Sequence, residues 1–216
     1  MIGIYVLMND NMIIETQYFG SIQYFVALAQ HHTATIELME NWQKISFRNR
    51  TVIAGSNGLI TLTIPILNGR EQKGLIKDIK INYSEHWQKM HWKTITSCYG
   101  KSPFFEFYKD KLYAILVEKQ FIYLVDLNQQ LLQWALQQLK LKTIVVTSES
   151  FIKDYHSTVN DYRNKWMPKN FQNQKSLIGY TQVFQHKIGF QHNLSILDIL
   201  FCEGPAASQI INSISI

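Results

Sequence analysis

The first forty residues change from one hydrophobic pattern to another. An apolar run over Ile2–Ile14 predicts an extended segment, and apolar positions over Ile22–Gln30 predict a helix after a turn at 18–21. A second extended run covers Thr35–Met39. This order predicts two parallel strands joined by a crossover helix. The loop between the first strand and the helix commonly faces a ligand in such folds, so Tyr18 is a candidate wall of a site.

The next part of the chain has a period of two, which is typical of strands. Apolar and polar residues alternate over Ser46–Ala54 and again over Ile60–Ile66. Between the two runs stands Asn57-Gly58, a pair that tolerates the positive φ angles of a tight turn. These runs predict an antiparallel β-hairpin. A further strand is predicted over Ile76–Tyr83.

Capping signals then predict a largely helical middle section. A helix is expected over Glu85–Tyr99, with Ser84 as its N-cap and Gly100 as its stop. Pro103 stands at the tolerated first position of a second helix. The broad apolar arc of Leu127–Leu139 predicts a third helix, which we expect to be well buried.

The C-terminal third is less regular. A short β-branched strand is predicted over Thr143–Thr147, and the polar stretch 148–174 is expected to be a long loop or an excursion over a site. Ser195 is the expected N-cap of a helix, with Asp198 as its capping-box partner. Residues 206–216 are expected to form a loosely held tail.

These elements predict an α/β fold with a mixed sheet: a parallel strand-helix-strand start, a β-hairpin and a largely helical middle section. With 216 residues, 46% of them hydrophobic and 13% aromatic, the chain can bury a substantial core. We expect a single domain over residues 1–216, because no repeat or linker divides the chain.

Charge and cysteine content narrow the classes of partner. The net charge is +5, but lysines and arginines are scattered and form no run of five. A small anionic or phosphate-bearing ligand is therefore favoured over nucleic acid. The start lacks a basic leader region and no apolar run approaches the roughly 18 residues of a membrane span, so a cytoplasmic location is expected. The two cysteines are too few for a disulfide scaffold. Composition does not determine the oligomeric state.

Several familiar catalytic patterns do not occur in the sequence: GxxxxGK, GxGxxG, GxSxG, HExxH and CxxC. The histidine pairs have no carboxylate or cysteine at metal-ligand spacing, so no metal or cofactor is predicted. A triad of His192, Ser195 and Asp198 is disfavoured because the two latter residues fit a helix cap. Cys98 and His91 stand about 10 Å apart along a helix, too far for a thiol and its base.

Arg48 and Arg50 are candidate anion-binding residues. Alternate residues of a strand project from one face about 6 to 7 Å apart, a spacing that suits two guanidinium groups on one anion. Lys44, just upstream, could join them. The alternative is an exposed edge strand kept soluble by its charges, and the local sequence slightly favours this second interpretation.

His91 is the candidate proton-transfer residue. It lies on the mostly apolar face of its predicted helix, beside Trp87. A histidine on such a face is more often a packed core residue than a general base or a ligand contact. Tyr18, Tyr24 and Tyr99 are likewise core aromatics by default.

Six segments, in a characteristic order, resemble the WbqC-like protein family: TQYFGSIQYF, ENWQKISFRNRTVI, GLITLTIPI, HWQKMHWKTITSCYGKSPFFEFY, FIYLVDLNQQLLQWAL and NLSILDILFCEGP. The resemblance covers most of Tyr18–Pro205. It implies a role in the synthesis of O-antigen and other surface polysaccharides. The activity proposed for the family is transfer of an amino acid, glycine, onto an amino sugar.

The resemblance also places functional residues by position. The tyrosine-bearing first loop, the NR pair and the W-K-H segment of the family match these residues: Tyr18 and Tyr24; Asn49 and Arg50; Trp87, Lys89 and His91. Many relatives carry Gln-Pro before the loop tyrosine, whereas this chain has Glu15-Thr16-Gln17 without a proline. That difference affects the conformation of the loop.

The leading hypothesis is an acyl or aminoacyl transferase acting on an amine-bearing, nucleotide-linked sugar. Its candidate catalytic residues are His91, as general base, and Lys89. Its candidate substrate-binding residues are Tyr18, Tyr24, Arg48, Asn49, Arg50, Trp87 and Tyr99, with the arginines gripping phosphate and Tyr18 or Asn49 stabilising an oxyanion. Two alternatives are a non-catalytic nucleotide-sugar-binding or scaffold protein of the same pathway, and a nucleotidyl-transfer enzyme.

Overall fold

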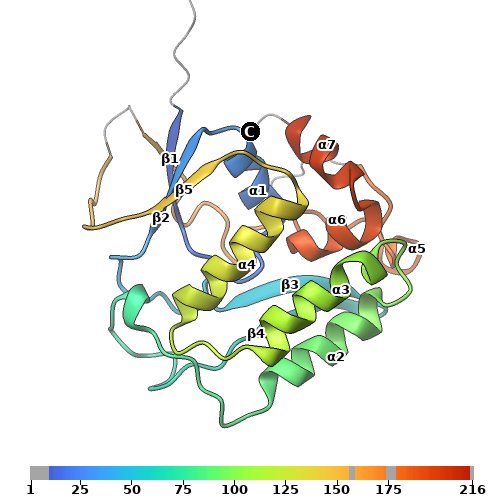
Figure 1. The fold of residues 1–216 in the computed structure, drawn as a ribbon, viewed down its shortest axis with the longest axis horizontal. Helices are drawn as coiled ribbons and strands as arrows, with labels where there is room; N and C mark the ends of the chain where they lie inside the picture. The colour runs from blue at the N-terminus through green and yellow to red at the C-terminus, as the bar shows by residue number, and fades with distance from the viewer. Residues whose placement is uncertain (1–9, 156–158, 174–178, 215–216) are drawn as a thin grey trace, which may run out of the picture.

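The parallel strand-helix-strand start is present as predicted in the computed structural model, which describes residues 10–155, 159–173 and 179–214 (Figure 1). Strand β1 (Asn11–Glu15) leads through α1 (Ile22–Ala29) to β2 (Thr33–Glu37). The two strands pair in parallel, with Asn11 opposite Thr33. Of the first predicted strand, residues 2–9 lie outside the described residues.

Two further parallel strands extend this sheet on both sides. The predicted strand near Thr143 is confirmed as β5 (Ile144–Thr147), which pairs with β2. On the other side, β6 (Asn160–Asp161) pairs with β1. The strand order is therefore β5-β2-β1-β6. Because β6 lies within 148–174, that stretch contributes a strand to the sheet as well as loop.

The predicted hairpin forms a separate two-stranded sheet. Strand β3 (Arg50–Gly55) pairs antiparallel with β4 (Gly58–Thr63), and Gly58 has the positive φ angle of 132° that the turn needs. The strand begins at Arg50 rather than at Ser46. Arg48 is therefore outside the strand, and the predicted spacing of two arginines along one strand face is wrong.

The strand predicted over Ile76–Tyr83 is also wrong. Ile76–Asp78 forms a short 3-10 turn, and the residues after it make only isolated bridges. Ile79 and Ile81 are buried. Their alternation reflects burial of two isoleucines in irregular backbone, which a period of two cannot distinguish from a strand.

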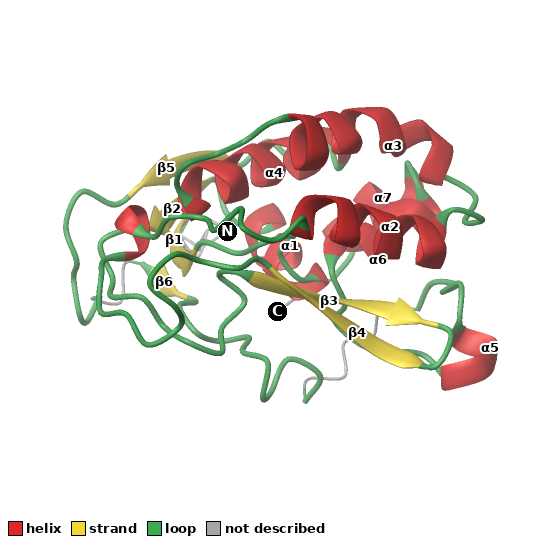
Figure 2. Ribbon diagram, turned by 90° about the horizontal axis from the view of Figure 1, so that it is seen from below, coloured by secondary structure: helices red, strands yellow, loops and turns green. Residues whose placement is uncertain are grey.

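The helical middle section is confirmed, with changes at its ends. It consists of α2 (Trp87–Tyr99), α3 (Phe105–Tyr113), a π-helical turn (Ala114–Glu118) and α4 (Leu124–Gln138). Figure 2 shows α2 and α3 side by side next to the hairpin. The N-cap of α2 is His86 and not Ser84, without a side-chain hydrogen bond. Gly100 keeps right-handed helical angles, so no left-handed cap ends α2.

The C-terminal region packs more tightly than expected. After α5 (Gln185–Ile188) come α6 (Ile196–Glu203) and α7 (Ala206–Asn212). The main buried core includes Ala207 and Ile211 of α7, so the prediction of a loosely held tail is wrong for residues 206–214. Residues 215–216 lie outside the described residues. The sequence AASQIIN places its apolar residues on one helical face, and tertiary packing stabilises that short helix.

Shortening a buried side chain of α7 should therefore reduce the stability of the protein. We expect Ile211→Ala to lower the free energy of unfolding by about 2–5 kcal/mol, because Ile211 is fully buried and its removal leaves a cavity. The exposed neighbour Gln209 offers a matched control, with a change within about 0.5 kcal/mol for Gln209→Ala. Urea unfolding measures both. Equal midpoints for the two variants would show that α7 is held loosely.

Candidate functional site

His91 meets Tyr18 inside the protein, although 73 residues separate them in the sequence. The Tyr18 hydroxyl lies 2.9 Å from His91 Nδ1. Both side chains are buried, Tyr18 completely. Burial lowers the pKa of His91 to about 4, while a hydrogen bond with the Thr63 backbone opposes this shift. The imidazole is therefore neutral at pH 7 and links the β1–α1 loop to α2.

Some of the other candidate residues contact His91 in the structure, and others lie away from it. The Trp87 ring packs edge-on against His91, with ring centroids 5.2 Å apart. Lys89 is exposed on α2. Tyr99 instead donates a hydrogen bond to Asp198 at 2.6 Å. Tyr24 is buried against Phe25, and burial raises its pKa well above the usual value. Of the candidate residues, Tyr18 and Trp87 contact the predicted base.

Asp198 is not the capping-box partner of Ser195 that we expected. Ser195 does cap α6, since its side chain accepts from the Leu197 amide. The carboxylate of Asp198, however, is fully buried and accepts hydrogen bonds from Tyr99, Tyr180 and Gln182. These buried partners occupy both carboxylate oxygens.

Arg48 and Arg50 have different environments. Arg48 is fully buried and binds Glu40 with two hydrogen bonds, Nε to Oε1 at 2.7 Å and Nη2 to Oε2 at 2.6 Å. Arg50 is half-buried, and its Nε has no hydrogen-bond partner among the residues that the structure describes. Asn49 donates to the Ile64 carbonyl at 2.8 Å. Lys44 is paired with Glu71. The four residues therefore do not converge on one anion.

A group of charged residues, of which the sequence analysis named only Arg48 as a candidate, lies where the parallel strands end. We call it the strand-end cluster, and it consists of Glu15, Glu37, Glu40, Arg48, Asp161 and Arg163. Glu15, Glu37 and Asp161 are the last residues of β1, β2 and β6. Because parallel strands end at the same edge, these three carboxylates face one region. Ligands of open α/β sheets bind at this carboxyl edge.

Hydrogen bonds hold the two innermost carboxylates. Glu15 accepts from Gln17 Nε2 at 2.7 Å and from the Asn164 amide at 2.9 Å. Glu37 accepts from the Ser148 hydroxyl at 2.6 Å and from Arg163 Nη1 at 3.3 Å. Both residues are nearly inaccessible to solvent, so they support the site from beneath without touching a ligand.

Arg163 binds several residues of the polar segment that follows β5, near the ends of the strands. Its guanidinium binds Asp161 at 2.6 Å and the carbonyls of Ile152 and Lys153 at 2.9 and 3.0 Å. The rings of Phe151 and Tyr155 lie 5.2 and 5.1 Å from its guanidinium carbon. Arg163 therefore links residues 151–155 to Asp161 at the end of β6.

A cavity of about 490 Å³ opens beside this cluster. Its lining combines two aromatic rings with charged and amide groups: Glu40, Asn41, Trp42, Gln43, Phe151, Lys153, Asp161, Arg163 and Asn164. Its size suits a small organic ligand. His91 lines neither this cavity nor the larger groove described next, and its buried ring faces Tyr18.

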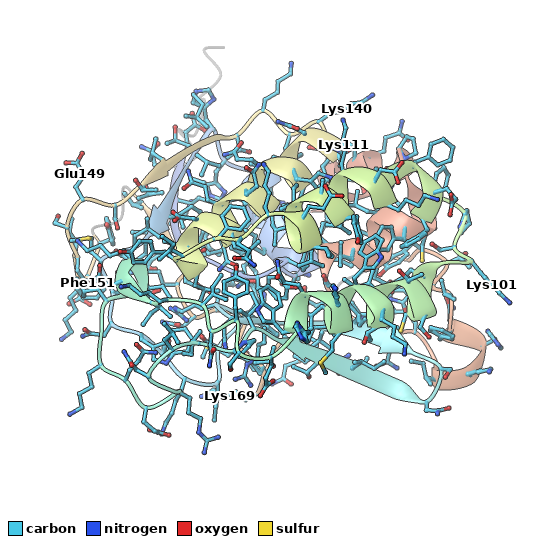
Figure 3. All side chains as sticks on the ribbon, turned by 60° about the horizontal axis from the view of Figure 1, so that its bottom comes forward. Lys101, Lys111, Lys140, Glu149, Phe151 and Lys169 are labelled. Carbon is cyan, nitrogen blue, oxygen red and sulfur yellow. The ribbon has the colours of Figure 1, made fainter. Side chains whose placement is uncertain are left out.

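A larger groove of about 650 Å³ lies elsewhere, between the α2–α3 turn, α6 and residues 181–186. Figure 3 places Lys101, on this groove, and Phe151, on the strand-end cavity, at opposite ends of the molecule. Burial and then the charge of Asp198 raise the pKa of Cys202, which lines the groove. The thiol is therefore protonated and is a poor nucleophile. The strand-end cavity has the more reactive lining.

Opposing influences act on the two carboxylates that line the strand-end cavity. Burial raises the pKa of Glu40, and Arg48 opposes that increase. Burial also acts to raise the pKa of Asp161, but hydrogen bonds from Arg163 lower it overall. A carboxylate with a raised pKa in a cavity is a candidate proton acceptor. Glu40 fits that description better than Asp161.

One sequence signal for this cluster was present. Glu15 directly follows the run Ile2–Ile14, where a ligand site is expected, whereas Glu37 lies inside the second predicted run, Thr35–Met39. Asp161 and Arg163 carry no such signal, because they lie in a polar stretch without periodicity. Their position depends on β6, a strand of two residues.

Comparison with known proteins agrees with the resemblance carried by the six sequence segments. The profile of the WbqC-like protein family matches residues 16–159, two thirds of the chain. The chain belongs to the WbqC-like protein family. No curated protein and no solved structure matches it. The family match covers the β1–α1 loop, Glu40 and His91, whereas Asp161 and Arg163 lie just beyond it. In the described part of this WbqC-like chain, no helix is long and apolar enough to cross a membrane.

The lowered pKa of His91 gives a pH-dependent stability. The folded-state pKa is about 4 and the ordinary value is 6.5, so the unfolded state binds a proton first as the pH falls. The contribution of His91 is fully present above pH 6.5 and is lost by about pH 4, a change of about 3 kcal/mol. We expect urea midpoints to fall less over this range for His91→Gln than for the wild type. Parallel pH profiles would contradict the burial of a neutral imidazole.

The buried pair of Arg48 and Glu40 gives a second stability prediction. Glu40→Gln leaves the buried guanidinium without its counter-charge and should cost about 3–5 kcal/mol. The double variant Glu40→Leu with Arg48→Met removes both charges and should recover most of that loss. Urea unfolding compares them, with Glu71→Gln in the exposed Lys44 pair as the control. If Glu40→Gln behaved like this control, the pair would not be buried.

Proposed function

We propose that this WbqC-like protein transfers an acyl or aminoacyl group, such as glycine, to the amine of a nucleotide-linked sugar in surface polysaccharide (O-antigen) synthesis. We also propose that the strand-end cavity binds the sugar. The observation that carries this proposal is the excess of carboxylates in the strand-end cluster, beside an aromatic-walled cavity on the carboxyl edge of the parallel sheet. A cytoplasmic location remains a prediction.

The charges of the strand-end cluster favour an amine. Its four carboxylates outnumber its two guanidinium groups, and one negative charge remains in excess when Lys153 of the cavity lining is included, although the whole chain has a net charge of +5. An ammonium group is attracted to such a local negative excess, and the low dielectric of a partly buried site strengthens that attraction. An anionic sugar without an amine would be repelled there.

The remaining lining suits a sugar ring. Trp42 and Phe151 offer apolar faces, against which the C–H face of a sugar can pack. Asn41, Gln43 and Asn164 supply amide donors and acceptors for hydroxyl groups. A mostly polar cavity with a few aromatic surfaces binds a hydroxylated ring better than a lipid chain.

Glu40 is the residue best placed to accept a proton in this reaction. An amine attacks only after its ammonium proton has passed to water, and it loses a second proton as the amide forms. In the proposed step the nitrogen bonds to the carbonyl carbon of an activated acyl donor, and the leaving group departs with its electron pair. The nitrogen proton moves to the Glu40 carboxylate, whose pKa is raised by burial.

In this proposal His91 and Tyr18 hold the loop after β1 in place and do not react with the substrate. Their hydrogen bond fixes the loop that follows β1, and Gln17 of that loop donates a hydrogen bond to Glu15, the last residue of β1. The role of His91 as general base stays a prediction. A buried, neutral imidazole already bound to Tyr18 would need the loop to open before it could accept a proton from substrate.

One observation favours a binding protein as the second candidate. Both oxygens of Glu40 already accept hydrogen bonds from Arg48, which restrains the carboxylate that would act as base. A non-catalytic protein would bind the same sugar at the same cavity. Turnover therefore separates the two candidates, whereas binding alone does not.

The amine preference can be measured with two ligands. We expect the wild type to bind a nucleotide-linked amino sugar at least about tenfold more tightly than its N-acetylated counterpart, because only the free amine carries charge. Asp161→Asn should remove most of that preference. Asp161 is accessible in the cavity, so the variant should remain folded. Isothermal titration calorimetry gives both affinities.

The matched control is Asp110→Asn, which removes an exposed carboxylate on α3. It should leave the preference unchanged. Equal affinity of the wild type for the two sugars would exclude the amine site. A preserved preference together with no acyl transfer from any activated donor would select the binding protein.

A further inference from the structure

The two edges of the parallel sheet differ in how well they are protected. One edge is β6, a strand of only two residues, and such a short edge gives another chain little to pair with. The other edge is β5, which covers Ile144–Thr147 and lies beyond β2. Residues 143–148, TIVVTS, contain no charged residue and no proline, and β5 pairs with β2 without a bulge. The usual devices that keep an edge strand from pairing are therefore missing from β5.

The backbone of β5 has hydrogen-bonding groups that point away from the sheet. The Ile144 amide donates to the His32 carbonyl at 2.8 Å, and the Ser148 amide donates to a carbonyl of β2 at 3.0 Å. Because these groups alternate in direction along a strand, the amides and carbonyls of Val145 and Thr147 point outward. No hydrogen bond from the described residues reaches them. They are free to pair with an added strand.

Two apolar side chains on one face of β5 are open to solvent. The exposed fractions of Ile144 and Val146 are 49% and 44%, and both project from the same face because the side-chain period of a strand is two. Phe151 and Ile152, which follow the strand, are also exposed. Four of the ten exposed large apolar side chains in the described part thus fall within residues 144–152. An exposed apolar surface beside an open strand edge is typical of an interface.

The charges that flank β5 suit a second copy of the same chain. Lys140 and Lys142 precede the strand and Glu149 follows it, and all three are exposed. None of them makes an ion pair within the described part of the chain. Figure 3 shows Lys140 and Glu149 extending into solvent on either side of β5. Two antiparallel copies of the strand would place the basic end of one beside the acidic end of the other, whereas parallel copies would place like charges together.

We propose that β5 pairs antiparallel with β5 of a second copy about a two-fold axis, which joins the two parallel sheets into one. A two-fold interface is self-complementary, so each copy supplies the groups that the other needs. One register uses every outward group of both strands. In it Val145 lies opposite Thr147 of the second copy, and Val146 lies opposite its own counterpart. The two Val146 side chains then pack together on the exposed face.

A charge at the centre of this interface tests it. We expect the 216-residue chain to be a dimer in analytical ultracentrifugation. Val146→Lys should weaken dimerisation at least about tenfold, because two lysines would stand directly opposite each other. Val146 is exposed in the single chain, so the variant should keep its fold, which circular dichroism checks. Phe107→Lys places the same charge on an exposed residue of α3 and should leave the dimer unchanged.

Cysteine cross-linking tests the register. Val146→Cys should form a disulfide-linked dimer under mild oxidation, because opposed residues at such a position have Cα atoms about 4.5 Å apart. Ile144→Cys, on the same face, should not cross-link, because its counterpart would lie about 13 Å away along the strands. The natural cysteines, Cys98 and Cys202, are buried, so the unmodified chain serves as the blank.

Two results would overturn the interface. One is a monomeric wild type, which would leave the edge to a strand of a different protein. The other is a dimer that Val146→Lys leaves intact. Cross-linking through Ile144→Cys but not through Val146→Cys would overturn the register. The interface is independent of the proposed function, because no substrate takes part in it.

Discussion

The buried ion pair between Arg48 and Glu40 is the interaction on which the strand-end region depends. A guanidinium with no solvent contact needs both a counter-charge and a fixed geometry. Arg48 obtains these from Glu40 and from Asn164, and Asn128 of α4 donates to its backbone carbonyl at 2.8 Å. This one residue therefore joins the loop after β2 and the segment after β6 through its side chain, and α4 through its backbone. The position of the cavity follows from that junction.

Local patterns predicted those parts of the fold whose burial is regular. The parallel start and the hairpin were confirmed because their apolar positions follow the period of the element they form. Ile79 and Ile81 misled the prediction of a strand, since irregular backbone can bury alternate side chains equally well. The last helix was missed because a seven-residue helix has little intrinsic stability and depends on its contacts with α1 and α6.

Prediction of the site had a different limit. A sequence shows which residues have suitable chemistry, but partners distant in the chain meet only in the fold. Arg48 and Arg50 are equivalent in a strand pattern, yet the bend before β3 gives one of them a buried carboxylate and leaves the other without one. Arg163 shows the converse, because its importance comes from contacts with Glu37 and Asp161 that no local spacing indicates.

The short strand β6 has a consequence for how the chain can be divided. It pairs with β1 just past residue 159, where the family match ends. A fragment cut at that boundary would lose this pairing and turn β1, an interior strand rich in isoleucine, into an open edge. Unpaired edges of this kind recruit strands from other molecules. The residues after the shared family region therefore also protect the sheet from self-association.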